Sequence, residues 1–470
     1  MTKPRPVLLL EINEVPWRLL DRFMDDPEFP AIRRFFDGSK TFTTFTVDQG
    51  ELSPWVTWPS FHRGMSNREH GIAFLGQDPK TYRGTPIWEE YRNRGYPIGV
   101  FGSLQSWPPV DPGQNGFYVP DTFAQDESCL PRQVEVFQRF NLAQTGKNGR
   151  IVQKGALGSS ARSGELFSFL KAMPRLGIST KTVGLVAKQL LGERVDPARI
   201  ARRPIFQAIL AWDVFKSLYL AENPPVFSTF FTNHVAGILH RYWHHVFPED
   251  FPERFEKKHR DTSKPHLATL RFALKVLDGI LKDAMDIATS NPGIILVFAT
   301  SMGQAAVHRN EHEGLELTIP RVERFIAAIC AAICPALGNE CRPLLAMVPQ
   351  VAVEIPADAM RAEVKRILRE SKTASGGELF RFEESGSHLN ITLVNPRATD
   401  IRAGAFLLPG GKKMTWEKAE IRVIEIEAGT GYHIPEGVMA IYPQEADARD
   451  ERRKLSARDA KGFLMGLSGL

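Results

Sequence analysis

Residues able to bind metals or substrates stand directly after several apolar runs that have the length of buried strands. In chain order they are Asn13 and Glu14 after residues 7–12, Asn233 shortly after 226–231, and Ser301 with Met302 after 294–299. In an open sheet of parallel strands, ligands bind beyond the carboxyl ends of the strands. We therefore expect these side chains, although far apart in the sequence, to meet at one edge of a sheet.

Two histidines are candidates for the same place. His240 lies in the segment His-Arg-Tyr-Trp, and His433 lies in the segment Gly-Tyr-His-Ile-Pro-Glu-Gly. A neutral imidazole is a common ligand of divalent metals, zinc above all. Because a zinc–nitrogen bond is about 2 Å long, one ion can join the two rings only if their nitrogens lie within about 10 Å of each other.

A segment rich in hydroxyls and aromatic rings runs from residue 52 to residue 64. Its three candidate nucleophiles are Ser53, Thr57 and Ser60. A hydroxyl becomes a useful nucleophile when a metal or a base lowers its pKa. His62 and Arg63 follow in the same segment, and together with Asn13 they are candidates for binding the anionic oxygens of a substrate.

The pattern of the chain indicates the elements that must position these residues. Short apolar runs alternate with helical patterns, which is typical of an α/β protein. The runs are almost continuously apolar, as expected for parallel strands covered on both faces. The helical patterns lie at residues 87–94, 205–221 and 266–290. We predict a mostly parallel central sheet with helices on both faces.

The same pattern divides the chain into four stretches. Residues 1–129 and 204–340 carry the first and second parts of the α/β core, and residues 341–470 carry a β-rich lobe and complete the core. Residues 130–203 differ in pattern, with Gly/Ser-rich turns and basic amphipathic helical segments, and they predict an inserted helical cap. Its basic residues include Lys154, Arg162, Lys171 and Arg175. If the cap borders the active-site cleft, these charges raise the local concentration of an anionic substrate.

Composition excludes several classes of protein. The chain has 470 residues, of which 43% are hydrophobic and 24% charged, as in globular proteins. The 59 basic and 54 acidic residues are interspersed, so no basic block of the kind that binds nucleic acid is present. Four cysteines in so long a chain do not indicate a disulfide scaffold. A small anionic substrate is the expected partner, and the sequence does not indicate an oligomeric state.

Targeting and membrane signals are weak. The apolar run after the basic N-terminus is broken by Glu11, so it is too short for the apolar segment of a signal peptide. The longest uncharged stretch, at residues 325–339, is shorter than the roughly 20 residues of a membrane helix. We expect a cytoplasmic protein without a membrane span.

Three segments in a fixed order resemble a known family. They are Thr57-Trp58-Pro59-Ser60 followed by Gly64 and His70-Gly71-Ile72, then His240-Arg241-Tyr242-Trp243, then the Gly431 to Gly437 segment. This set is similar to the alkaline phosphatase superfamily, and especially to its type I phosphodiesterase and nucleotide pyrophosphatase branch. The resemblance implies a Thr57 nucleophile and two divalent ions, usually zinc. Aligning Gly64 without a gap favours a position nearer Ser53, so Ser53 and Ser60 remain alternatives.

The chain departs from the family at its metal ligands. The six matching positions are Asn13, Asn233, His240, Ser301, Met302 and His433. The set Asn13, Ser301 and Met302 offers poor ligands for zinc, so we expect that ion to be absent. The set Asn233, His240 and His433 keeps both imidazoles, and we expect it to hold one divalent ion, zinc.

Other side chains could compensate for the lost carboxylates. The candidates are Glu11, Glu14, Asp48 and Glu51 near the strand ends, and His308, Glu311, His312 and Glu313 farther along. The resemblance then implies a hydrolase or transferase acting on phosphate esters or diesters. The alternative is a phosphatase-like protein that has lost catalysis and binds an anionic ligand or a protein partner.

Overall fold

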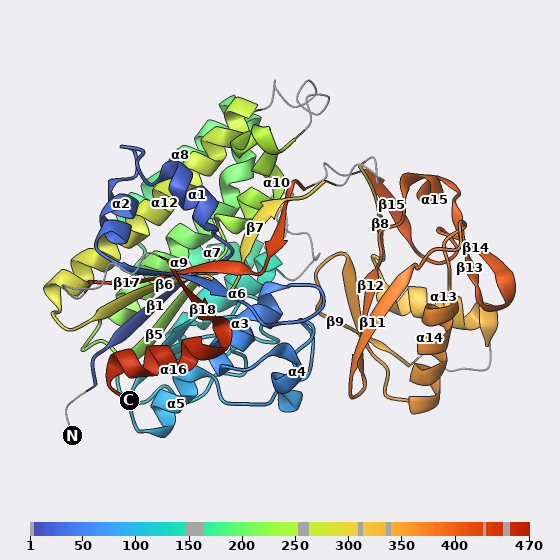
Figure 1. The fold of residues 1–470 in the computed structure, drawn as a ribbon, viewed down its shortest axis with the longest axis horizontal. Coiled ribbons are helices and arrows are strands. Elements are labelled where there is room, and N and C mark those ends of the chain that lie inside the picture. The colour runs from blue at the N-terminus through green and yellow to red at the C-terminus, as the bar shows by residue number, and fades with distance from the viewer. Residues whose placement is uncertain are drawn as a thin grey trace.

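The computed structural model describes residues 4–145, 163–251, 263–308, 314–334, 340–425, 429–444 and 452–470. Its centre is an eight-stranded sheet with the order β18-β2-β17-β6-β1-β5-β3-β4 (Figure 1). The strands are β1 (Val7–Ile12), β2 (Lys40–Phe45), β3 (Ile98–Phe101), β4 (Phe117–Val119), β5 (Phe227–Thr232), β6 (Ile295–Ala299), β17 (Glu436–Tyr442) and β18 (Arg453–Ser456).

The sheet is mostly parallel, as predicted. Strand β1 lies in its interior and pairs in parallel with β5 on one side and β6 on the other. Strand β17 runs antiparallel to both of its neighbours, β6 and β2, while β18 is parallel to β2 and β3 is parallel to β4 and β5. All six residues of β1 are buried, which explains why that run is apolar almost throughout.

Helices cover both faces of the sheet, which confirms the predicted fold class. Leu8 and Leu10 of β1 face one apolar core, while Val7 and Leu9 face another. The first core receives α1 (Trp17–Phe23), α2 (Pro30–Asp37), α9 (Arg203–Tyr219), α10 (Ala236–Val246) and α12 (Ser263–Ser290). The second receives α3 (Pro54–Arg63), α5 (Ile87–Asn93) and α16 (Ala457–Ser468).

The described part of residues 130–203 is helical. It forms α6 (Glu135–Thr145), α7 (Ser163–Ala172), α8 (Thr180–Val195) and the short η3 (Pro197–Arg202). Phe137 and Phe169 of this region are buried in the first core. Lys154 and Arg162, two of the cap residues that we expect to attract an anionic substrate, lie outside the described residues.

A second lobe with a core of its own lies beside the sheet, on the right of Figure 1. It contains a four-stranded sheet in the order β11-β12-β10-β9. Its elements are β8 (Leu315–Thr318), α13 (Val322–Ile333), β9 (Arg342–Leu344), β10 (Gln350–Glu354), α14 (Asp358–Glu370), β11 (Phe380–Ser385), β12 (His388–Leu393), α15 (Ala398–Arg402), β13 (Ala405–Leu408), β14 (Lys412–Thr415) and β15 (Arg422–Glu425). Its core begins at Leu317, before the expected boundary at residue 341, because β8 pairs with β15.

The chain returns from this lobe to the central sheet through β16 (Gly431–Ile434), which pairs with β7 (Gly303–Ala306) directly after β6. In this pairing His433 lies opposite Gln304. Strands β1, β5 and β6 are parallel neighbours, so their carboxyl ends open on the same edge of the sheet. No helix in the described parts of the chain has the length and apolarity needed to cross a membrane.

Candidate metal centre and active site

Glu14 stands at the centre of the strand-end cluster. The chain leaves β1 with a hydrogen bond from the Asn13 amide to the Thr232 carbonyl, and Glu14 then adopts a left-handed conformation with a φ of 57°. Such a φ is uncommon outside glycine and signals a constrained backbone. The Glu14 side chain is 2% exposed, and its Oε2 lies 2.8 Å from His240 Nε2 and 3.4 Å from His433 Nε2.

Backbone carbonyls fix both imidazole rings. His240 Nδ1 donates to the Gly431 carbonyl at 2.9 Å, and His433 Nδ1 donates to the Leu52 carbonyl at 2.7 Å. Since Nδ1 donates in each ring, Nε2 is the nitrogen turned toward Glu14, where it donates to the carboxylate when protonated and is free to bind an ion when it is not. Only glycine fits at 431, because a Cβ there would lie 2.6 Å from the Leu239 carbonyl oxygen of α10.

The two rings converge as the sequence predicts. Their centroids are 5.0 Å apart, although His240 comes from α10 and His433 from β16. The nitrogens of both rings lie within hydrogen-bonding or ion-pairing reach of the same Glu14 oxygen. One ion could therefore contact both imidazoles and the carboxylate, so the sequence-based test of the ring spacing is passed.

Charge and hydrogen bonds keep Glu14 ionised. Burial by itself raises the pKa of the Glu14 carboxyl, but the neighbouring His433 and His240 outweigh it and hold the pKa well below its usual range. For His433, burial lowers the pKa, but the Glu14 carboxylate, with the Leu52 carbonyl and Glu51, more than reverses this effect, so the pKa of His433 is raised. Asn13 donates to Glu14 Oε1 at 2.8 Å and Gln304 donates to Oε2 at 2.5 Å.

Glu14, His240 and His433 form what we call the ligand cluster. Their ligand atoms all lie within 4.8 Å of one another, and no other group of His, Cys, Asp or Glu in the described parts of the chain meets that condition. Two imidazoles and one carboxylate, with nitrogens and oxygens as donors, match the ligand sets of catalytic zinc sites. The side chains present therefore fit a divalent ion.

Asn233, expected as the third ligand beside the two histidines, reaches the ligand cluster through Asn13. Its Oδ1 accepts a hydrogen bond from Asn13 Nδ2 at 2.8 Å, and the residue itself is exposed. The third residue beside the two histidines is therefore Glu14. It is one of the carboxylates that the sequence analysis gives as candidates to replace the missing acidic ligands. Of the other carboxylates, Glu51 accepts from the Tyr432 hydroxyl, and Asp48 accepts from Ser60.

The three positions of the ligand set from which we expect the ion to be absent, together with Thr57, form what we call the neutral group. Its members are Asn13, Thr57, Ser301 and Met302. All four are buried, and the Thr57 and Ser301 hydroxyls are hydrogen-bonded to each other at 2.8 Å. Trp58 Nε1 donates to Asn13 Oδ1 at 2.9 Å, so the one oxygen that Asn13 could offer a metal is already engaged.

The three candidate nucleophiles lie in different surroundings. Thr57 and Ser60 are fully buried inside α3, and Ser60 Oγ is hydrogen-bonded to Asp48 Oδ1 at 2.6 Å and to His70 Nε2 at 2.9 Å. Ser53 is the N-cap of α3, is 5% exposed, and makes no capping hydrogen bond with its side chain. It directly follows Leu52, whose carbonyl holds His433.

His62 and Arg63, the candidate substrate-binding residues, lie in the interior on the α3 side of the sheet. His62 is 0% exposed, its Nε2 lies 2.8 Å from Glu11 Oε1, and its ring stacks on Trp58. Arg63 is 7% exposed and lies over the Tyr82 ring, and burial lowers the pKa of its guanidinium. In this arrangement neither side chain opens to a substrate at the strand ends.

The remaining candidate ligands are not part of the ligand cluster. His308 is exposed beside Phe251, and Glu311, His312 and Glu313 lie outside the described residues. Sequence reasoning did not single out Gln304 for its contact with Glu14. Its position three residues after Ser301, at the start of the polar segment that follows β6, is the signal that could have identified it.

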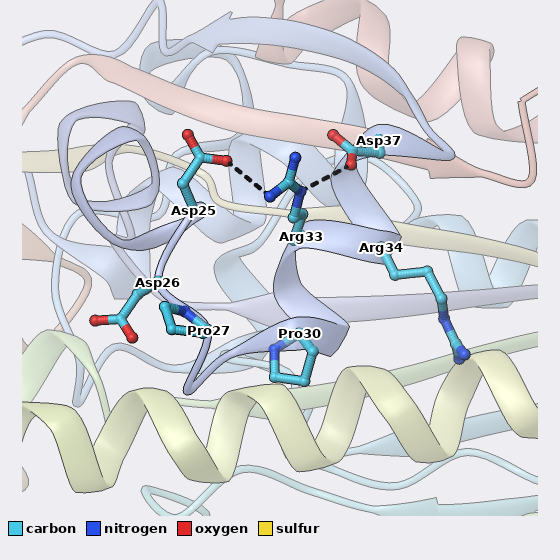
Figure 2. A pocket seen from close by; sticks show the side chains of 7 residues that line it. All are labelled: Asp25, Asp26, Pro27, Pro30, Arg33, Arg34 and Asp37. Carbon is cyan, nitrogen blue, oxygen red and sulfur yellow. Dashed lines mark hydrogen bonds and ion pairs between the residues drawn. The ribbon is translucent and has the colours of Figure 1, made fainter.

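A surface depression at the start of α2 is unrelated to this centre (Figure 2). Its lining residues are Asp25, Asp26, Pro27, Pro30, Arg33, Arg34 and Asp37. Figure 2 shows Arg33 held between Asp25 and Asp37, with nitrogen–oxygen distances of 3.6 and 3.4 Å. The charges of this depression are paired among its own residues and with α12, so it offers no set of free ligands.

Comparison with known proteins gives similarity of structure only. No protein-family model and no curated protein sequence matches the chain. Human ectonucleotide pyrophosphatase/phosphodiesterase 5 matches with a TM-score of 0.46 and 9% identity, over 99% of this chain and 95% of that one. Phosphonoacetate hydrolase from Sinorhizobium meliloti, in complex with phosphonoacetate, matches with a TM-score of 0.42 and 12% identity over 100% of both chains.

A third solved structure, a TAB5 alkaline phosphatase mutant with magnesium bound, matches with a TM-score of 0.38 and 8% identity, over 100% of this chain and 99% of that one.

Proposed function

We propose that the protein is a metal-dependent hydrolase of phosphate esters or diesters, with its centre at the ligand cluster. The observation that carries the proposal is the convergence of two imidazole Nε2 atoms on one buried carboxylate. Both rings are oriented by backbone carbonyls, so the arrangement exists before any ion binds. A preorganised set of this kind is expected for a catalytic ion rather than for a chance surface cluster.

Glu14, His240 and His433 would hold one divalent ion, and zinc is the ion that this donor set favours. When bound, such an ion supplies Lewis acidity, which lowers the pKa of a nearby hydroxyl and offsets the charge of the phosphate. Gln304 and Asn13 each donate a hydrogen bond to Glu14, so they orient the carboxylate. Asn233, exposed beside Asn13, is available to bind a substrate oxygen.

Among the three hydroxyls, Ser53 is the nucleophile that we propose. It lies at the start of α3, where the helix dipole favours the negative charge of an alkoxide and of a phosphate. It also adjoins the carbonyl that orients His433. Thr57, which the sequence motif favours, remains the alternative, although it must first break its hydrogen bond to Ser301 and leave a fully buried position.

The test is metal content together with hydrolysis of a phosphodiester, measured on protein purified without chelators. We expect about one ion per chain and hydrolysis that chelation abolishes. The Ser53→Ala variant should lose hydrolysis and keep its metal and its thermal stability, because the Ser53 side chain makes no capping bond. Thr57→Val is the matched variant: if it abolishes hydrolysis while Ser53→Ala does not, Thr57 is the nucleophile.

A second candidate function is a phosphatase-like protein that binds an anionic ligand or a protein partner without turnover. The observation in its favour is the neutral group, in which the two hydroxyls are paired with each other and the thioether is buried, rather than open to a second ion. If the protein binds its ion and inorganic phosphate but hydrolyses neither monoesters nor diesters, this second function replaces the first.

A further inference from the structure

Helix α8 is amphipathic in the opposite sense to an ordinary surface helix. Its buried residues are Thr182, Gln189 and Glu193, which are 4%, 6% and 8% exposed. Its exposed apolar residues are Val183, Leu190, Leu191 and Val195, which are 43%, 40%, 61% and 88% exposed. A surface helix normally turns its apolar stripe to the core and its polar face to water.

Polar contacts hold the helix in this orientation. Thr182 donates to Asp213 at 2.6 Å, Gln189 donates to the Arg199 carbonyl at 2.7 Å, and Glu193 accepts from Arg203 at 2.6 Å. Turning the helix over would strip these groups of their partners and leave the largely buried Arg203 without its carboxylate, which is strongly unfavourable. The outward position of the apolar residues is therefore a built feature of the fold.

Helix α7 also carries exposed apolar residues. Phe167 and Leu170 are 68% and 49% exposed, whereas Phe169, between them, is buried in the core. We call the exposed apolar residues of the two helices the outer cap face: Phe167, Leu170, Val183, Leu190, Leu191 and Val195. Six of the ten exposed large apolar side chains in the described parts of the chain belong to these two helices.

The exposed charges within residues 167–195 have one sign, and Asp196, which follows Val195, is paired with Arg199 at 3.5 Å. The exposed charged residues of residues 167–195 are Lys171, Arg175, Lys181, Lys188 and Arg194. None of the five has an ion-pair partner within the described ranges of the chain. The one acidic residue in this stretch, Glu193, is buried and paired with Arg203. The surface therefore combines exposed apolar area with uncompensated positive charge.

We propose that the outer cap face binds the surface of an anionic lipid bilayer. A helix with apolar side chains on its outer face and Lys and Arg beside them lies in the plane of such a surface, its apolar groups reaching into the acyl boundary. Helix α8 has 16 residues and is about 24 Å long, enough for its four exposed apolar side chains to insert together. Long basic side chains at the edge can extend to the headgroups while their stems stay in apolar surroundings.

Charge complementarity decides among the occupants. A second copy of this chain would bring five further positive charges against the same five, so self-association is disfavoured. The chain that leads into α7, residues 146–162, contains four basic and no acidic residues by sequence, so it does not neutralise the face either. An anionic membrane supplies both an apolar layer and negative charge, and each basic residue near it adds to binding.

The test is cosedimentation of the full chain with vesicles. We expect binding to vesicles of equal parts phosphatidylcholine and phosphatidylglycerol, much weaker binding to phosphatidylcholine alone, and a decrease as salt is raised. Lys181→Glu with Lys188→Glu should weaken binding by about thirtyfold or more. Leu191→Ser with Val195→Ser should weaken it on both kinds of vesicle, since it removes inserted apolar area.

Matched variants outside the outer cap face serve as controls. Lys413→Glu with Lys418→Glu makes the same change of charge on the second lobe, and Leu220→Ser with Val423→Ser removes the same two kinds of exposed apolar side chain, 49% and 43% exposed, outside the face. Both should bind vesicles like the unmodified protein. All the substituted side chains are exposed, so thermal unfolding should be unchanged and a loss of binding cannot be attributed to misfolding.

Three results would overturn the proposal. The first is equal binding of the unmodified protein to anionic and neutral vesicles, or none to either. The second is a dimer in light scattering that Leu191→Ser with Val195→Ser dissociates, which would make the outer cap face an interface between copies. The third is binding to an acidic polypeptide such as polyglutamate without binding to vesicles, which would indicate an acidic protein partner. Hydrolysis of a soluble phosphodiester is independent of all three.

Discussion

The ligand cluster and the neutral group lie at the same edge of the same sheet, and they differ in the charge they can hold. In the ligand cluster, Glu14 stays ionised in a buried position because two imidazoles and two amide groups surround it. In the neutral group, the Thr57 and Ser301 hydroxyls pair with each other, and Asn13 offers its oxygen to Trp58. A metal needs lone pairs that converge and are not already engaged, so position at a strand end is not sufficient.

The largest expected effect comes from breaking the ligand cluster. His240→Ala or His433→Ala should abolish bound metal and lower phosphodiester hydrolysis by more than about a hundredfold, because even the loss of an outer partner of a ligand costs 10–100-fold. Elemental analysis of the purified variants and their initial rates are the measurements. Met302→Leu, which changes the neutral group at nearly constant volume, should leave both quantities unchanged.

The outcome for the control is as informative as the outcome for the histidines. If Met302→Leu also removes the metal, the ion lies nearer the neutral group than we propose. If the unmodified protein carries two ions per chain, the neutral group binds metal despite its hydrogen bonds. If it carries none under metal-replete conditions, the second candidate function is favoured.

Giving the neutral group the family's ligands should make the two regions alike. The variant Asn13→Asp, Ser301→Asp, Met302→His should raise the stoichiometry from one ion toward two. Without metal, it places carboxylates at positions 13 and 301, where Asn13 and Ser301 are 1% and 0% exposed, so the free energy of unfolding should fall by about 3 kcal/mol. Added zinc should recover that loss, because binding to the folded state alone stabilises it. A variant that is destabilised and gains no second ion would show that the backbone no longer fits one.

Much of the fold could be predicted from the sequence, because buried parallel strands leave continuous apolar runs. Strands β1, β5 and β6 lie where the runs predict them, and their carboxyl ends bring His240 and His433 together as expected. The choice of Glu14 among eight compensating side chains could not be predicted. It depends on the left-handed turn after β1, which aims the carboxylate at the two rings and has no sequence signal of its own.

The direction of the α3 side chains also escaped the sequence argument. The motif suggests that Thr57, His62 and Arg63 serve the substrate, but a motif does not define which face of a helix meets the sheet. Trp58 and His62 are four residues apart, share a face, and stack at 5.4 Å inside the core. Glu11, at the inward-facing position of β1, pairs with His62 there. These contacts depend on how α3 packs on the sheet, which the sequence motif does not define.

The protonation state of the buried His70, which is hydrogen-bonded to Ser60 of α3, can be tested by the pH dependence of stability. Burial, followed by the charges of Arg63 and Arg83, lowers the pKa of His70 to about 3, so the folded protein keeps this ring neutral. The unfolded chain protonates it below about 6.5, so the stabilisation is complete above that pH and is lost as the pH falls toward 3. We expect His70 to contribute up to about 1.4 kcal/mol of lost stability per pH unit in this window.

Denaturant unfolding between pH 7.5 and pH 5 measures this slope. The His70→Gln variant should show a smaller decrease in unfolding free energy on acidification than the unmodified protein, even if it is less stable at neutral pH. Equal slopes for the two proteins would mean that His70 is already protonated, or exposed, in the folded state. Ser60, which is hydrogen-bonded to both His70 and Asp48, would then lie between two groups that can carry opposite charges.

The smallest expected effect concerns the bond that closes the neutral group. Thr57→Val and Ser301→Ala each leave one buried hydroxyl without its partner, which should cost about 1–3 kcal/mol of unfolding free energy. The double variant removes both groups and should cost less than the sum of the two, with a coupling of about 1 kcal/mol in a double-mutant cycle. If the two costs simply add, the hydroxyls do not depend on each other, and Thr57 is free to turn toward the ligand cluster. A Thr57 nucleophile requires that turn. The coupling energy therefore also helps to decide between Thr57, which the sequence motif favours, and Ser53, which its position at the start of α3 favours.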